Sequence, residues 1–306
     1  MGVIHELLVE HGLAQLELEL DLTPDDLQTA RIAARFMSDE RVGPSFVHPA
    51  ICLTTLPHRA QPPEKIWVRD TGRARLSIQP ITPDSGTPIG VPYGSRARMI
   101  LLYLMTEAVK NRSRYVELGR SMYAWLRSMG IPICGKNYAA VVDQSKRIEY
   151  SLMSFRYRGD DGITEIKDLF IRGSFRPFQD SDEKTVELSE GFYDALLRRP
   201  VPVVEAAVRA LSDTCMPLDI YLWLAYRLHA LETSVVVPWH SLHTQFGADT
   251  RLLKHFKPRF HRALRTALAV YPEGRAIMVD KGCRIEPSTP PVMSVRPSYR
   301  ALRGGR

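Results

Sequence analysis

Residues 248–270, ADTRLLKHFKPRFHRALRTALAV, decide the fold, because their charged and apolar side chains separate on a helical wheel. At about 100° per residue the apolar side chains cover roughly 120° of arc, which predicts one amphipathic helix from 249 to 270. These side chains are Leu252, Leu253, Phe256, Phe260, Ala263, Leu264 and Ala267. The opposite face carries Arg251, Lys254, His255, Arg259, His261, Arg262 and Arg265. No carboxylate interrupts the stretch between Asp249 and Glu273, so the helix presents one strongly basic face.

The sequence on either side of this helix completes a pattern. A short predicted helix ends at Gly247, and two strand-like runs follow in RAIMVDKGCRIEP (275–287). Gly282 suits a tight hairpin turn between these runs. Helix, turn, basic helix and basic hairpin in this order are typical of a winged helix that binds DNA. The alternative for this segment is a core helix whose outer face is basic and solvated.

Length, composition and charge narrow the class of protein. A chain of 306 residues with 44% hydrophobic and 25% charged residues is long enough for two domains with real cores. Its net charge of +7 favours a polyanionic partner. The four cysteines are scattered without a CxxC pair, which indicates reduced thiols in a cytosol. No apolar run approaches the ~20 residues of a membrane span, and the N-terminus lacks the features of a signal peptide. We therefore expect a soluble cytoplasmic protein.

The same order of predicted elements occurs twice, about 120 residues apart. The first copy has a buried helix at 96–110, a strand at 114–116, a short helix that Ser121 can cap, and a helix from about 136 to 155. The runs ITEIKDLFI and KTVEL then form a long wing. The second copy has a helix from Pro217, a strand at 235–237, a short helix, the basic helix and the hairpin. We predict an α+β, mainly helical fold of two tandem winged-helix domains related by an architectural pseudo-repeat.

This pattern divides the chain into five segments. Residues 1–45 form a variable helical segment in which Thr23 and Pro24 start a helix. Residues 46–92 are an extended, proline-rich lead-in that contains a β-hairpin around Asp70, Thr71 and Gly72. The first winged helix covers 93–200 and the second 201–287. Residues 288–306 form a basic tail, which we predict to be disordered.

Motifs for catalysis are incomplete. Gly130–Lys136 spells G-x-x-x-x-G-K, but Asn137 replaces the Ser or Thr that binds magnesium, and a helix precedes the motif where a strand is needed. His240 and His243 lie three residues apart without a carboxylate or cysteine nearby, so a metal site is not indicated. The chain has neither the His-x-His pair of nicking initiators nor a G-x-S-x-G motif. We expect no enzymatic activity, no cofactor and no metal.

Several blocks of sequence resemble the plasmid-encoded RepA family of replication initiators. They are VPYGSRARMILLYLMTEAV (91–109), VELGRSMYAWLRSMGI (116–131), GKNYAAVVDQSKRI (135–148), PLDIYLWLAYRL (217–228), PWHSLHTQFG (238–247) and YPEGRAIMV (271–279), together with LPHR (56–59) and WVRDTG (67–72). The resemblance covers about residues 45–285. It departs from the family pattern at Cys134–Gly135, where two glycines are expected.

The resemblance implies a bacterial protein that binds repeated duplex sites (iterons) at a plasmid origin, opens the duplex and recruits host replication proteins, an initiator and a helicase. It also implies that one winged helix mediates formation of a homodimer and that dimers repress the protein's own promoter. A winged-helix transcriptional repressor and a protein-interaction adaptor are the alternatives. An ATP-dependent enzyme is a weaker one, because it depends on the incomplete Gly135–Lys136 loop.

The candidate DNA-contacting residues follow from charge and position. In the second unit the basic helix fits the major groove, which is ~12 Å wide, and its N-terminal residues lie nearest the base edges. Its candidates are Arg251, Lys254, His255, Arg259, Arg262 and Arg265. The wing residues Arg275, Lys281 and Arg284 are candidates for phosphate or minor-groove contacts. In the first unit the candidates are Lys136, Asn137, Lys146 and Arg147, which lie on a face of mixed charge.

Overall fold

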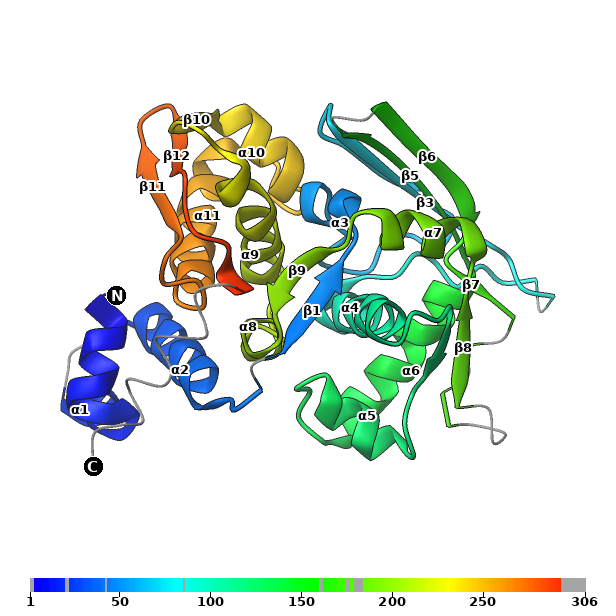
Figure 1. The fold of residues 1–306 in the computed structure, drawn as a ribbon, viewed down its shortest axis with the longest axis horizontal. Coiled ribbons are helices and arrows are strands. Elements are labelled where there is room, and N and C mark those ends of the chain that lie inside the picture. Colours follow the sequence, from blue (N-terminus) through cyan, green and yellow to red (C-terminus); the bar gives the residue numbers. More distant parts are fainter. Residues whose placement is uncertain are drawn as a thin grey trace.

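The computed structural model describes residues 3–19, 22–41, 43–84, 86–159, 162–173, 175, 177–178 and 184–292. The predicted disordered tail lies outside the described residues from 293 onward. Figure 1 shows an α+β molecule in which helices pack between small antiparallel sheets. One hydrophobic cluster runs through both halves of the chain and includes Trp125 in the first half and Trp223 in the second. The two halves therefore share a continuous core.

From Met216 to Glu286 the second half contains a three-stranded sheet packed with helices. They follow in the order α9 (Met216–Arg227), β10 (Val235–Pro238), α10 (Trp239–Phe246), α11 (Leu253–Leu268), β11 (Arg275–Val279) and β12 (Gly282–Glu286), with a 3-10 turn at Leu228–Ala230. The sheet order is β10-β12-β11, and both pairings are antiparallel. Gly282 is required at the start of β12, because a Cβ there would lie 1.9 Å from the carbonyl oxygen of Val237.

The first half contains the same sequence of elements with an insertion. It consists of α4 (Gly94–Asn111), β4 (Tyr115–Glu117), α5 (Met122–Ser128), α6 (Gly135–Glu149), β7 (Ile171–Arg172) and β8 (Thr185–Leu188). The sheet order β4-β8-β7 matches that of the second half, strand for strand. Ser121 caps α5 by accepting a hydrogen bond from the Ala124 N–H at 3.2 Å, as the sequence predicts.

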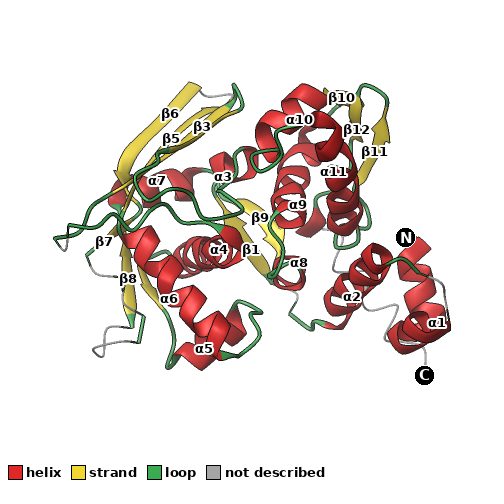
Figure 2. Ribbon diagram, turned by 180° about the vertical axis from the view of Figure 1, so that it is seen from behind, coloured by secondary structure: helices red, strands yellow, loops and turns green. Residues whose placement is uncertain are grey.

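The inserted hairpin β5 (Ser151–Gly159) and β6 (Gly162–Leu169) belongs to a four-stranded sheet of order β2-β3-β5-β6. The other two strands are β2 (Trp67–Asp70) and β3 (Ala74–Pro80), which form the hairpin predicted around Gly72. Between the two units, β1 (Pro44–Val47) pairs with β9 (Val201–Val204). The short helices α3 (Pro49–Leu53), α7 (Glu190–Arg198) and α8 (Glu205–Ala210) surround this pair (Figure 2).

Two N-terminal helices pack on the second unit. These are α1 (Val3–Glu19), which is interrupted at Gly12, and α2 (Pro24–Ser38). The Thr23 hydroxyl caps α2 by accepting from the Asp26 N–H at 3.2 Å, which confirms the predicted helix start. Leu8, Leu16 and Ala33 pack against Ala269 at the end of α11. The Thr29 and Thr266 hydroxyls lie 3.1 Å apart, so α2 is in direct contact with α11.

Two predictions about the first unit are wrong. The helix expected from 136 to 155 ends at Glu149, because every second side chain from Ser151 to Tyr157 is buried and this segment pairs with β3. The run ITEIKDLFI does not form the wing with KTVEL. Most of it is β6, which pairs with β5, and only Ile171–Arg172 pairs with β8. In both cases strand pairing across the inserted sheet outweighed the local pattern.

Candidate nucleic-acid interface

Aromatic packing holds α11 against the second unit and orients its basic side outward. Phe256 and Phe260 are fully buried, with ring centroids 5.5 Å apart, and Phe246 lies 5.6 Å from Phe260. The Trp239 ring at the start of α10 packs nearly perpendicular to the rings of Phe256 and Phe260. Burial of two phenylalanine side chains contributes roughly 1.5–3 kcal/mol each, so the rotation of this helix about its axis is strongly determined.

The N-terminal end of α11 carries the exposed cations. Arg251, Lys254 and His255 are all exposed, and in the described part of the chain neither Arg251 nor Lys254 forms an ion pair. Leu252 and Leu253, which the helical wheel placed on the apolar face, are 50% and 38% exposed. The helix begins at Leu253 rather than at 249, so these two leucines project from its first turn into solvent. The result is an exposed end that combines positive charge with apolar side chains.

The remaining cations of the basic helix have protein partners. The Arg259 guanidinium donates to the Thr250 hydroxyl and so holds the loop before α11. Arg262 pairs with Asp25 at 3.4 Å, and Arg265 pairs with Asp26. Both aspartates lie in the first turn of α2. The basic face is therefore divided: its N-terminal end is open, and its C-terminal end is covered by acidic side chains from a segment more than 230 residues away in sequence.

The wing carries two exposed cations at opposite ends of its hairpin. Arg275 at the start of β11 and Lys281 in the hairpin turn are exposed, whereas Arg284 is half-buried and pairs with Glu286 at 3.2 Å. The indole N–H of Trp239 donates to the Asp280 carbonyl at 2.9 Å, and the backbone N–H of Trp239 donates to the Lys281 carbonyl at 3.2 Å. These two bonds fix the turn that carries Lys281 against the start of α10.

The sequence prediction omitted two residues of α11. Lys257 places its ammonium group 4.9 Å from the centre of the Trp239 ring, a cation–π contact that keeps this charge next to the wing turn. Pro258 lies inside the helix and removes one backbone N–H donor from it. Both residues are visible in the sequence, and the i, i+3 spacing of Lys254 and Lys257 is the signal that would have included Lys257.

In the first unit, two of the four candidate residues are exposed and two are held by contacts within the protein. Lys136 and Lys146 are exposed on α6. The Asn137 side chain instead accepts from Arg96 at 2.9 Å and donates to the Pro132 carbonyl at 2.7 Å. Arg147 pairs with Asp143 at 2.9 Å, donates to the Ile89 carbonyl and lies over the Tyr93 ring. Asn137 and Arg147 are thus held in contacts within the unit.

A buried ion pair joins the two units. Arg98 on α4 donates from Nε and Nη2 to the two carboxylate oxygens of Asp219 on α9, both at 2.7 Å. The same guanidinium donates to the carbonyls of Leu56 and Pro57. His58 lies between Asp219 (3.2 Å) and Asp249 (3.4 Å), and Asp249 belongs to the loop that leads into α11. Arg98 and His58 occur in the YGSRAR and LPHR motifs, whose structural role the sequence alone did not suggest.

The surroundings of Asp219 determine its charge. Burial acts to raise the pKa of this carboxyl, but the Arg98 guanidinium and the hydrogen bond from His58 outweigh burial and lower its pKa below the ordinary value. Asp219 is therefore ionised at neutral pH. The pair is only 4% and 7% exposed, so it connects the first and second units through a desolvated contact. His58 extends this contact from Asp219 to Asp249 in the loop before α11.

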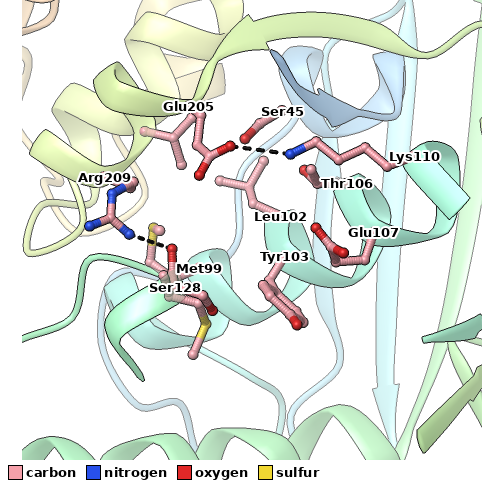
Figure 3. Close-up of a pocket in the computed structure, with 12 residues that line it drawn as sticks. Ser45, Met99, Leu102, Tyr103, Thr106, Glu107, Lys110, Ser128, Glu205 and Arg209 are labelled. Atoms are coloured by element: carbon pink, nitrogen blue, oxygen red, sulfur yellow. Dashed lines mark hydrogen bonds and ion pairs between the residues drawn. The ribbon is translucent and has the colours of Figure 1, made fainter. Parts of the chain in front are cut away.

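A small cavity lies between β1, α4 and α8, and Figure 3 shows its lining. Its volume of about 60 Å³ is far below the ~300–1,000 Å³ of small-molecule sites. Lys110 pairs with Glu205 at 3.2 Å across its rim, and Arg209 donates to the Ser128 carbonyl. We interpret this cavity as a packing defect between helices rather than a ligand site.

The motifs considered for catalysis lie in structural positions. Gly130–Lys136 connects α5 to α6, with Gly130 in the left-handed region at φ 70°, so no strand precedes the Gly-x-x-x-x-Gly-Lys sequence. Within the described ranges no cluster of three His, Cys, Asp or Glu residues is arranged to hold a metal ion. Over the same ranges, no helix combines the length and apolar character needed to span a bilayer.

The chain is similar to one protein family and, in fold, to solved structures. No curated protein matches the sequence. A solved structure of domains 2 and 3 of RctB is similar over 77% of this chain and 95% of its own, with 14% identity and a TM-score of 0.49. A second structure of the same domains covers 76% and 93%, with 13% identity and a TM-score of 0.46. The family model of plasmid-encoded RepA proteins matches residues 91–239. The region from α4 to the start of α10 therefore belongs to the plasmid-encoded RepA protein family, which confirms the resemblance seen in the sequence motifs.

Proposed function

We propose that this protein initiates plasmid replication by binding repeated duplex sites at an origin, and that it does so without catalysing a reaction. The family match over residues 91–239 supports the role in replication. The observation that carries the proposal of DNA contact is the exposed N-terminal end of α11, where Arg251 and Lys254 form no ion pair with any described residue. The next turn of the same helix contacts the wing, since Lys257 lies over the ring of Trp239, whose indole N–H donates to the Asp280 carbonyl in the hairpin turn. A cationic helix end next to a cationic wing suits the phosphates and base edges of one groove.

We further propose that the two units are winged helices spanning about 93–200 and 201–287. The order helix, strand, helix, helix, strand, strand in both halves supports this assignment, as does the shared sheet order β4-β8-β7 and β10-β12-β11. In this assignment α11 is the recognition helix of the second unit and α6 its counterpart in the first. The hairpin β5–β6 is an insertion between the recognition helix and the wing of the first unit.

The first unit has a secondary role in this proposal. Of its four candidates, only Lys136 and Lys146 are exposed and form no ion pair with a described residue, so α6 offers few free cations for DNA. We propose that α6 contacts the adjacent stretch of the same site and that the first unit also forms the homodimer contact. Recruitment of a host initiator and helicase is part of the same proposal and follows from the family.

A transcriptional repressor with the same fold is the closest alternative function. An initiator sustains replication of a plasmid that carries its origin, whereas a repressor binds the duplex and does not. A protein-interaction adaptor, the second alternative, binds no duplex in a salt-dependent way. Replication of an origin plasmid, with the gene supplied in trans, therefore distinguishes an initiator from a repressor. A titration of duplex binding across salt concentrations tests the adaptor.

Replacing both Arg251 and Lys254 with Ala is expected to weaken specific duplex binding by ~1–3 kcal/mol for each base edge that the variant no longer binds. Both side chains are exposed and form no ion pair among the described residues, so the variant keeps its fold. Fluorescence anisotropy with a labelled origin duplex measures the effect, and Arg198→Ala on α7 provides a control that also removes positive charge. Unchanged affinity in the folded double variant would remove the N-terminal end of α11 from the proposed interface.

Neutralising Asp25 and Asp26 is expected to increase duplex affinity. The Asp25→Asn, Asp26→Asn variant releases Arg262 and Arg265, which are 52% and 49% exposed and become available to phosphates. The slope of log affinity against log salt should steepen by about 0.9 for each arginine that then binds a phosphate. Asp194→Asn, which removes one exposed carboxylate on α7, is a control for the effect of net charge. If affinity and slope equal those of the control, the acidic turn of α2 does not restrict these arginines.

A further inference from the structure

The turns of two hairpins meet at one end of the four-stranded sheet. Ala74 lies opposite Tyr157, and Gly159 lies opposite Gly162. The β2–β3 and β5–β6 turns therefore lie at the same end of the strands. A cavity of about 100 Å³ opens there. Its lining consists of Asp70, Gly72, Arg73, Ala74, Arg156, Arg158 and Ile163. Three guanidinium groups and one carboxylate therefore surround a space too small for a nucleotide base with its sugar.

The single carboxylate is already engaged. Asp70 lies 3.7 Å from Arg75 and 3.6 Å from Arg156, and it accepts from the Gly72 N–H at 2.9 Å. Arg73 and Arg158 form no ion pair with any described residue, and both are exposed. Asp160 and Asp161 follow in the sequence and lie outside the described residues. Within the described residues, the guanidinium groups of Arg73 and Arg158 are therefore not neutralised by a carboxylate.

A further arginine approaches from α9. The Tyr226 and Tyr157 hydroxyls lie 2.7 Å apart and bring the end of α9 against β5. Burial, and then the like charge of Arg73, lower the pKa of the adjacent Arg227. No described carboxylate is paired with Arg227 either. Arg73, Arg158 and Arg227, which form no ion pair with a described carboxylate, are a group of like charges that an anion stabilises, and the planar guanidinium matches phosphate oxygens in a bidentate fashion.

We infer that this cavity binds a backbone phosphate of the DNA engaged by α11; the inference rests on the proposed function. The cavity has room for one phosphate group and no aromatic wall for a base, which favours a contact to the phosphodiester backbone over a free nucleotide. Such contacts set the position of a protein along the duplex. The sheet is joined to the second unit, since the Arg69 guanidinium donates to the Thr244 carbonyl of α10 at 3.4 Å.

The two contact regions lie at the same end of the molecule. In both Figure 1 and Figure 2 the ends of β3, β5 and β6 that carry the hairpin turns lie on the same side of the molecule as α10 and β10. A duplex placed along this edge meets the end of α11 and then the hairpin turns. The cavity therefore extends the interface beyond the bases next to α11 and adds phosphate contacts in the flanking sequence.

The test compares the full-length protein with its Arg73→Ala, Arg158→Ala variant. We expect the slope of log affinity against log salt to flatten by about 0.9 for each phosphate that the variant no longer binds and the hydroxyl-radical footprint to shorten at one flank. The base contacts in the centre of the footprint should persist. Arg73→Lys, Arg158→Lys should recover part of the slope, and Arg172→Ala, Arg198→Ala removes the same charge elsewhere as a control.

Each outcome bears on one proposal. If the wild type itself shows no salt-dependent duplex binding, the proposed function fails. If the wild type binds and the alanine variant keeps the wild-type slope and footprint, the cavity is not a DNA contact and this inference fails alone. Thermal unfolding with added inorganic phosphate tests whether the cavity binds a free anion instead of a DNA phosphate. A phosphate-induced stabilisation that is absent from the variant while its duplex binding stays unchanged would assign the cavity to a free anion and overturn the inference.

Discussion

The affinity of this protein for its specific duplex is expected to fall about 10³-fold or more between 50 and 200 mM salt. In the proposed complex the N-terminal end of α11, the wing, α6 and the arginine cavity are together expected to neutralise on the order of 6–10 phosphates, each of which would contribute about −0.9 to the slope of log affinity against log salt. Anisotropy titrations of a labelled origin fragment across this salt range measure the slope directly. Sulfate and chloride salts compared at equal ionic strength control for specific anion effects.

The same titration tests whether DNA binding requires ATP or a metal ion. Binding is expected to be equal with and without ATP and with and without a chelator, because Gly130–Lys136 lies between two helices and lacks the hydroxyl residue that holds magnesium. A flat response to salt would refute phosphate-based recognition. Strict dependence on ATP would instead support the enzymatic alternative.

Replacing Arg98 with Met is expected to destabilise the protein by ~3–5 kcal/mol, because it leaves the ionised Asp219 buried without its partner. Arg98 and Asp219 are 4% and 7% exposed, so water cannot take the place of the guanidinium without opening the core. Urea unfolding followed by tryptophan fluorescence measures the change. Arg114→Met, which breaks a more exposed pair with Glu187, is the matched control.

Two further measurements separate this effect from general damage to packing. The double variant Arg98→Met, Asp219→Leu removes both charges and should recover much of the stability. In the wild type the lowered pKa of Asp219 stabilises the fold at neutral pH, and this contribution disappears as the pH falls through that pKa. The difference between wild type and Arg98→Met should therefore narrow in acid. A constant difference across pH would show that the guanidinium acts by packing alone.

Much of the architecture was accessible from local sequence. The apolar spacing of Phe256, Phe260 and Leu264 predicts a helix with a buried side, and α11 buries those three residues. Turn chemistry at Gly72 and Gly282 predicts two hairpins, and both form. These features depend on residues a few positions apart, so periodicity and turn preferences are sufficient to encode them. The bounds of the two units and their roles in DNA contact stay predictions.

Other features were decided by contacts between distant segments. Residues 151–155 were expected to continue the helix but belong to β5, because β3 supplies a pairing partner from residues 74–80. Leu252 and Leu253 fit the apolar stripe, yet the helix starts too late to bury them.

The sequence by itself determined that this protein has a basic helix beside a basic hairpin, repeated architecture in its two halves, and the motifs of the plasmid-encoded RepA family. Only the tertiary structure decided which of the charged side chains are paired within the protein and which remain exposed to bind a partner. Arg262 and Arg265 meet Asp25 and Asp26 across more than 230 residues, and Arg98 meets Asp219 across 121. The physical reason is that a charge pair depends on distance in space, whereas helical periodicity and turn preference depend on distance along the chain.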